Sequence, residues 1–195
     1  MLLVNSKAIV IKKQNKKKII KISGKSQLNP IDIRVPGDPS SAAFFVALTL
    51  LNKNSSIKIK NVGLNKTRLG FYDILKKQRA KIKFKNLKKI NNEIRGDIIV
   101  NSCKIKPISV NKSFYVSSTD EYPILFVMAA LANGISSFKG IGDLVNKESN
   151  RITEMQKVLR QIGVKSKFSD GTLNIYGKGN IDASNKKINV PNLGD

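Results

Sequence analysis

Charged side chains gather at the expected start of an amphipathic helix over residues 147–162. Glu148 and Arg151 are three residues apart and Lys147 and Arg151 are four apart, so the spacing predicts that they share one helix face. Two cations beside one carboxylate can bind an anionic substrate and also move a proton. A solvated first helical turn has the same composition, so the spacing alone leaves both interpretations open.

Asp120 is a second acidic candidate, placed ahead of an apolar run at residues 124–131. It ends a Ser-Ser-Thr-Asp sequence, and such residues before an apolar run are typical of a helix start. We expect Asp120 to cap or lead that helix, near the positive end of the helix dipole, where a carboxylate stays ionised. An N-cap without a catalytic role is the alternative. Glu121 beside it is expected to be an ordinary residue of the first helical turn.

Composition excludes several kinds of site. The chain has 195 residues, 41% of them hydrophobic, which is enough for a substantial core. Histidine is absent and Cys103 is the single cysteine, so a Cys–His nucleophile, a His/Cys metal site and an internal disulfide are not expected. No apolar run reaches the ~18 residues of a membrane span. We expect a cytoplasmic protein that uses no metal, no cofactor and no membrane.

The formal net charge of +23 suggests nucleic-acid binding at first sight. The cations are spread along the chain, however, and aromatic residues that stack on bases are few. The densest group, at residues 12–18, is expected to form a hairpin turn between strands at 8–11 and 19–22. We therefore predict a solvated basic surface that attracts phosphorylated small molecules, and no nucleic-acid partner.

The chain repeats itself, since residues 35–84 resemble residues 116–168 at an offset of roughly 81 to 84 positions. Each repeat predicts the order β-α-β-α-β-β, hence an α/β fold with helices packed against mixed sheets. The expected helices are 40–51 and 68–78 in the first repeat and 120–132 and 147–162 in the second. The expected strands are 56–61, 80–84 and 98–100, then 136–140, 165–168 and 172–176.

The ends of the chain follow the same pattern, because residues 188–195 resemble residues 33–38. The expected organisation is therefore a tail of a preceding unit or an interdomain crossover at 1–34, followed by one domain over 35–195. That domain divides into units at 35–115 and 116–187, with the start of a third at 188–195. We expect the chain to be part of a longer protein.

Three segments together resemble one enzyme family, and they lie at 35–45 (VPGDPSSAAFF), 120–123 (DEYP) and 147–152 (KESNRI). In this order and spacing they are similar to 5-enolpyruvylshikimate-3-phosphate synthase (EPSP synthase). That family has two domains, each built from three β-α-β-α-β-β units. The chain resembles one half of the enzyme, mostly the domain formed by the C-terminal portion, without the N-terminal part and without the C-terminal end.

The resemblance implies transfer of the enolpyruvyl group of phosphoenolpyruvate to the 5-hydroxyl of shikimate 3-phosphate, with release of phosphate. Asp120 would accept the hydroxyl proton, and Lys147 would hydrogen-bond the same hydroxyl. Glu148 would act on the phosphoenolpyruvate methylene as acid and then as base. Arg151 would bind the phosphoenolpyruvate carboxylate, and Asp143 would contact shikimate 3-phosphate. Because the other domain and a His-Arg pair of the family are missing, we expect the chain alone to be inactive.

One departure from the family pattern falls in the expected site, and three alternatives remain. Asn150 stands where the family usually has Asp, which weakens any carboxylate that would orient Arg151. The related transferase acting on UDP-N-acetylglucosamine shares fold and chemistry. An RNA-binding module like RNA 3′-phosphate cyclase would bind RNA with a steep salt dependence. A degenerate fragment would keep the fold without function. The full-length family predicts a monomer.

Overall fold

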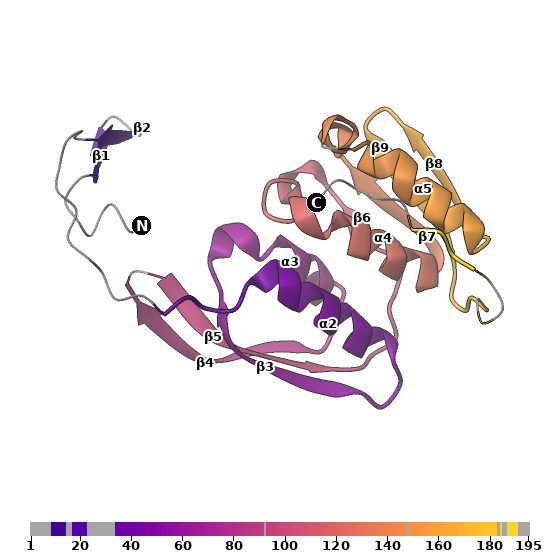
Figure 1. Ribbon diagram of the computed structural model, residues 1–195, viewed down its shortest axis with the longest axis horizontal. Helices are drawn as coiled ribbons and strands as arrows, with labels where there is room; N and C mark the ends of the chain where they lie inside the picture. Colours follow the sequence, from indigo (N-terminus) through magenta and orange to yellow (C-terminus); the bar gives the residue numbers. More distant parts are fainter. Residues whose placement is uncertain are drawn as a thin grey trace.

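The computed structural model describes residues 9–14, 17–22, 34–91, 93–147, 149–182, 184 and 187–190. Strand β1 (Ile9–Gln14) pairs antiparallel with β2 (Lys17–Ile22), which confirms the expected hairpin. Its turn was predicted too long, because residues 12–14 and 17–18 belong to the paired strands, and residues 15 and 16 lie outside the described part. Two α/β units follow in the chain, shown in purple to magenta and in rose to orange (Figure 1).

The first unit places two helices against a three-stranded sheet of order β3-β5-β4, in which both pairings are antiparallel. Its elements are α2 (Pro39–Leu51), β3 (Ser56–Gly63), a 3-10 turn η1 (Lys66–Arg68), α3 (Gly70–Lys77), β4 (Ile82–Ile90) and β5 (Glu93–Asn101). Just ahead of α2, Gly37 forms a parallel bridge to Val62 and serves as the short leading strand. The unit therefore follows the predicted order β-α-β-α-β-β.

The second unit repeats this path with a sheet of order β6-β7-β9-β8, in which β6 is parallel to β7 and the other pairs are antiparallel. Its elements are β6 (Ser109–Val110), η2 (Lys112–Phe114), η3 (Thr119–Glu121), α4 (Tyr122–Leu131), β7 (Asn133–Lys139), η4 (Gly142–Asn146), α5 (Arg151–Gln161), β8 (Lys165–Ser169) and β9 (Thr172–Lys178). The predicted fold class is confirmed. The leading strand lies earlier than the repeat suggested, because the turns η2 and η3 separate β6 from α4.

The core lies where α2 and α4 pack against each other between the two sheets (Figure 1). Helix α4 is apolar around its whole circumference, and its Phe126 is fully buried with its ring centroid 5.0 Å from that of Phe138 on β7. Edge-to-face pairs of this kind add to the hydrophobic stabilisation of a core. The junction of the two units is therefore a packed apolar layer.

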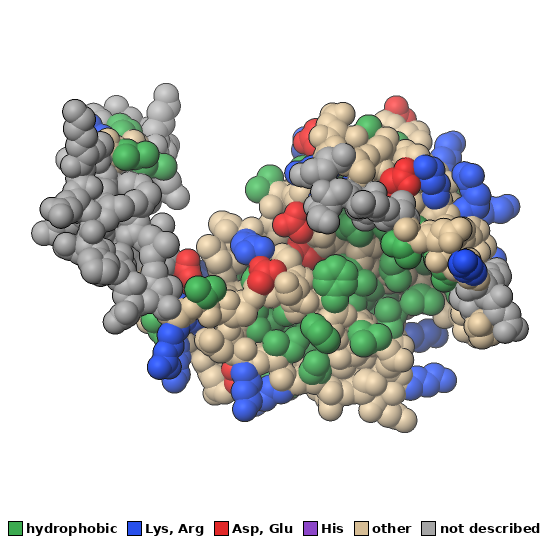
Figure 2. All heavy atoms as spheres, in the orientation of Figure 1, with side chains coloured by type: hydrophobic (Ala, Val, Ile, Leu, Met, Phe, Trp, Pro, Cys, Tyr) green, Lys and Arg blue, Asp and Glu red, His purple; other side chains and the backbone are tan. Residues whose placement is uncertain are grey.

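Helix α2 is also apolar all round, but one of its faces is open to solvent. Phe44, Phe45 and Leu48 are 58%, 57% and 61% exposed. Hydrophobic side chains gather over α2 and towards α4 on this face of the molecule (Figure 2). A helix without a polar face is typical of an element buried on every side, so this face has the composition of an interior surface.

Asp97 on β5 fixes two irregular places in the first sheet, where β3 and β4 each shift register against β5. Its carboxylate accepts hydrogen bonds from the backbone N–H of Asn61 (3.1 Å) and from Nδ2 of Asn86 (2.8 Å). It also pairs with Nζ of Lys58 at 3.1 Å. Asn61 and Asn86 both have φ of 53°, a left-handed conformation that Asn tolerates.

These contacts, led by the Asn86 hydrogen bond, lower the pKa of Asp97 to about 2. A depressed carboxyl pKa contributes stability that is present above the unfolded value, about 3.9, and is lost as pH falls through the folded value. Urea unfolding between pH 5 and pH 2 should show a smaller loss of stability for Asp97→Asn than for the unaltered chain. The exposed Asp170→Asn serves as control, and parallel pH profiles for the unaltered chain and Asp97→Asn would contradict this assignment.

Candidate active site

Helix α5 begins at Arg151, four residues later than the charged spacing suggested. Asn150 is its N-cap, and the Asn150 side chain accepts a hydrogen bond from the backbone N–H of Thr153 at 3.0 Å. Lys147 ends the preceding turn η4 with extended backbone angles (φ −82°, ψ −175°). The prediction that Lys147 and Arg151 share a helix face is therefore wrong. Asn150, which lies between them, caps α5, so the helix does not extend back to Lys147.

Three further candidates precede α5, and the structure describes two of them. Lys147 is exposed at the end of η4. Asp143 is exposed in the first turn of η4. Glu148 lies outside the described residues. The roles expected for these three side chains remain predictions.

Asp120 and Arg151 are brought together from different elements. Asp120 lies in the turn η3, directly before α4, and Arg151 is the first residue of α5. The Asp120 Oδ1 atom lies 3.9 Å from Arg151 Nη1, with 67% of the Asp120 side chain exposed and 9% of the Arg151 side chain exposed. The carboxylate is thus open to a ligand and close to a fixed cation.

The structure corrects the expected capping role of Asp120. The N-cap position of α4 is occupied by Glu121, and no side-chain hydrogen bond caps this helix. Asp120 still lies beside the N-terminus of α4, where the helix dipole favours a negative charge. Its carboxylate is therefore not used as a helix cap, which leaves it available to bind or to accept a proton.

Arg151 occupies an electrostatically unusual place for a cation. It is 7% exposed and stands at the N-terminus of α5, where the helix dipole is itself positive. Guanidinium and helix end together create a local positive potential that favours an anion. A planar carboxylate matches the two-pronged geometry of guanidinium, so this corner can bind a carboxylate or a phosphate.

Tyr115, at the end of η2, belongs to the same corner and was missed from the sequence. Its ring lies 5.9 Å from that of Tyr122 between centroids, and its hydroxyl is buried without a hydrogen-bond partner among the described residues. Burial raises the pKa of Tyr115, the Asp143 carboxylate raises it further, and Arg151 lowers it. Tyr115 therefore lies within electrostatic range of Asp143 and Arg151. A single tyrosine before a turn forms no sequence pattern that would predict its position beside Arg151.

Tyr115→Phe is expected to raise the free energy of unfolding by about 1 kcal/mol, because a buried hydroxyl without a partner is costly. Urea unfolding of the two proteins measures this difference. Tyr176→Phe on β9, where the side chain is exposed, should change stability by less than about 0.5 kcal/mol. A loss of stability for Tyr115→Phe would show that the hydroxyl has a partner after all.

The two linked β-α-β-α-β-β units, with an exposed carboxylate beside a buried guanidinium in the second of them, define a repeat-built α/β protein with a candidate site for an anion. The family model described as EPSP synthase (3-phosphoshikimate 1-carboxyvinyltransferase) matches residues 3–189. The chain belongs to the EPSP synthase family.

Relatives and solved structures agree with this assignment. The 3-phosphoshikimate 1-carboxyvinyltransferase of Zymomonas mobilis is 41% identical over 160 residues, which cover 82% of this chain and 35% of the relative. That of Aquifex aeolicus is 40% identical over 155 residues, covering 78% and 36%. The solved EPSP synthase of Acinetobacter baumannii gives a TM-score of 0.80 at 30% identity, covering 92% of this chain and 40% of that one.

A more distant structure supports the fold alone. The enolpyruvyl transferase NikO of Streptomyces tendae gives a TM-score of 0.61 at 13% identity. The chain spans somewhat over a third of the length of the curated relatives named above.

Proposed function

We propose that this chain is the part of an EPSP synthase that supplies the acid–base side of enolpyruvyl transfer. The reaction joins the enolpyruvyl group of phosphoenolpyruvate to the 5-hydroxyl of shikimate 3-phosphate and releases phosphate. The observation that supports this most is the juxtaposition of an exposed carboxylate, Asp120, with a buried guanidinium, Arg151, in a member of this family.

In this proposal Asp120 accepts the proton of the attacking 5-hydroxyl, as an ionised carboxylate can. Arg151 binds the carboxylate of phosphoenolpyruvate, which places the electron-poor carbon near that hydroxyl. Lys147 stabilises charge on the same hydroxyl oxygen. Glu148 protonates the phosphoenolpyruvate methylene and later removes a proton from it. Asp143 contacts shikimate 3-phosphate.

We also propose that the chain needs further polypeptide to act. The 1–34 segment is assigned to a preceding unit or crossover, and 35–195 to the domain of the C-terminal portion, ending with the start of a third unit. Because β6 pairs within the second sheet, we place the boundary between the two complete units within 102–108. The open apolar face of α2, with Phe44, Phe45 and Leu48, is expected to pack against the rest of the enzyme.

The remaining assignments concern location and partners. Within the described residues, no helix has the length and apolar character needed to cross a membrane. We propose a cytoplasmic enzyme that is monomeric at full length, takes two anionic small molecules and does not bind nucleic acid. The net charge of +23 would then increase the local concentration of these phosphorylated substrates.

A full-length chimera tests the proposal. This chain replaces the matching segment of the Zymomonas mobilis enzyme, and phosphate release is followed with both substrates present. We expect turnover that requires shikimate 3-phosphate and phosphoenolpyruvate together, with a new vinyl ether detected by NMR, and none from the 195-residue chain alone. A folded chimera that is inactive, or that accepts UDP-N-acetylglucosamine in place of shikimate 3-phosphate, would refute this assignment.

A further inference from the structure

Glu121 is a buried carboxylate beside the candidate base Asp120. It was expected to be an ordinary first-turn residue, yet it is only 5% exposed. It closes the turn η3, and its backbone N–H donates to the carbonyl of Ser118 at 3.1 Å. A carboxyl group removed from water needs a hydrogen-bond partner, because an unpaired buried charge is very costly. The polar partner of Glu121 therefore indicates which part of the protein holds the turn η3 in place.

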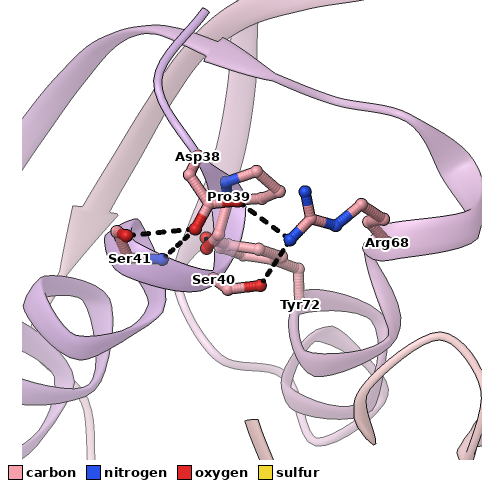
Figure 3. A network of polar contacts seen from close by, with 6 residues as sticks. All are labelled: Asp38, Pro39, Ser40, Ser41, Arg68 and Tyr72. Atoms are coloured by element: carbon pink, nitrogen blue, oxygen red, sulfur yellow. Dashed lines mark hydrogen bonds and ion pairs between the residues drawn. The ribbon is translucent and has the colours of Figure 1, made fainter. Parts of the chain in front are cut away.

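The partner comes from the other unit. Helix α2 contacts the turn η3, and the Ser40 hydroxyl at the start of α2 lies close enough to hydrogen-bond the Glu121 carboxylate and lower its pKa. Nη2 of Arg68 in turn donates to Ser40 Oγ at 3.0 Å (Figure 3). A guanidinium of the first unit is thus connected through one hydroxyl to a carboxylate of the second. Ser40 and Glu121 are 81 residues apart, so they hold equivalent positions in the two repeats and meet at the junction.

The first unit offers a rigid support for this contact. Asp38 caps α2 by accepting from the backbone N–H of Ser41 at 2.8 Å, and its Oδ1 pairs with Nη2 of Arg68 at 2.9 Å (Figure 3). The Tyr72 hydroxyl donates to the carbonyl of Pro39 at 2.6 Å. Cap, ion pair and tyrosine fix the backbone at the start of α2 from three directions, so a group bonded to Ser40 has little freedom.

We propose that Glu121 is a positioning residue whose carboxylate, bonded to Ser40 of the first unit, holds the turn η3 so that Asp120 faces Arg151. In a 3-10 turn, consecutive side chains point about 120° apart, since there are about three residues per turn. With Glu121 directed into the junction, Asp120 is directed out of it, towards Arg151. The catalytic importance of that orientation rests on the proposed function, whereas the orientation itself does not.

The charged and titratable groups facing Glu121 agree with this role. Burial raises the pKa of the Glu121 carboxyl, and the neighbouring Asp120 raises it further, whereas the Ser40 hydrogen bond and Arg68 lower it. Glu121 also acts on Tyr72, whose pKa is raised by burial and then by the charges of Glu121 and Asp38. The pKa of Tyr72, in the first unit, therefore depends on the ionisation of Glu121, in the second.

The test uses the complete 195-residue chain and NMR. Glu121→Ala and Ser40→Ala are expected to speed hydrogen exchange of the backbone amide at position 121 by at least about tenfold. Both should also shift the ¹³C resonance of the Asp120 carboxyl. Glu121→Gln should retain most of the protection, because its amide oxygen still accepts from Ser40. Glu154→Gln, which alters the Glu154–Lys157 pair on α5 (2.7 Å), is the matched control and should change neither readout.

Two results would overturn the proposal. In the first, Ser40→Ala leaves both the exchange rate of the position 121 amide and the Asp120 carboxyl resonance unchanged. In the second, the substitutions speed amide exchange equally over α5 and β9. Ser40→Ala removes one hydroxyl, so it decides the question even if Glu121→Ala fails to fold. Phosphoenolpyruvate titration followed by ³¹P NMR separates the two proposals. Lack of binding by the full-length chimera would count against the proposed function, and the exchange data on the 195-residue chain would still decide the role of Glu121.

Discussion

Replacing Asp120 by asparagine in the full-length chimera should lower turnover by about 10²- to 10⁴-fold, the range typical of losing a general base. The amide has nearly the same shape but cannot accept the hydroxyl proton. The side chain is 67% exposed and caps no helix, so the substitution should leave folding intact. Steady-state phosphate release at saturating concentrations of both substrates measures the effect.

The form of the loss carries as much information as its size. If Asp120 acts on the proton in the transition state, kcat falls while KM for phosphoenolpyruvate changes little. Asp170→Asn, in the exposed β8–β9 turn, is the control and should retain full turnover. A chimera whose kcat is unchanged by Asp120→Asn would exclude the carboxylate as the base, and a change confined to KM would reduce its role to binding.

The repeat could be predicted from the sequence because its signals are local. Asp38 as N-cap and Pro39 in the first turn predict the start of α2. The apolar runs that follow occur in both units at the same spacing. Each helix and strand has a local pattern of its own, so short-range patterns were enough to give the order β-α-β-α-β-β, although not the strand order β3-β5-β4 within the sheet. The sequence did not locate the leading strand β6, because a two-residue strand has no pattern of its own, and its pairing with β7 is tertiary.

The site was harder to predict, since its geometry depends on competition and on distant neighbours. Periodicity extended α5 back to residue 147, but the Asn150 side chain competes for the backbone N–H groups and starts the helix at Arg151. The burial of Glu121 comes with the contact between η3 and α2, in the other unit, which no local window contains. The family resemblance named Asp120 and Arg151, while their 3.9 Å approach came only from the fold.

Gly177 on β9 is the position where the smallest substitution should cause the largest loss of stability. A Cβ atom there would collide with the backbone carbonyl oxygens of Ala129 and Ala132, at the end of α4. Backbone atoms of a helix end cannot turn aside as a side chain can, so α4 would have to move away from the sheet. That movement opens the core around Phe126, and Gly177→Ala should lower the free energy of unfolding by about 3 kcal/mol or more.

Gly142→Ala provides the comparison, because a Cβ atom there would meet its nearest neighbour, the Cα of Gly171, at 3.9 Å. An added methyl in open space reduces the freedom of the unfolded chain and should change stability by less than about 1 kcal/mol. Urea unfolding of both variants separates the two effects, since each adds the same single carbon. If Gly177→Ala proved as stable as Gly142→Ala, α4 could not pack as closely on β9 as the structure shows. The approach of Asp120 to Arg151 would then need a different explanation, because α4 contacts both the turn η3, which carries Asp120, and the helix α5, which carries Arg151.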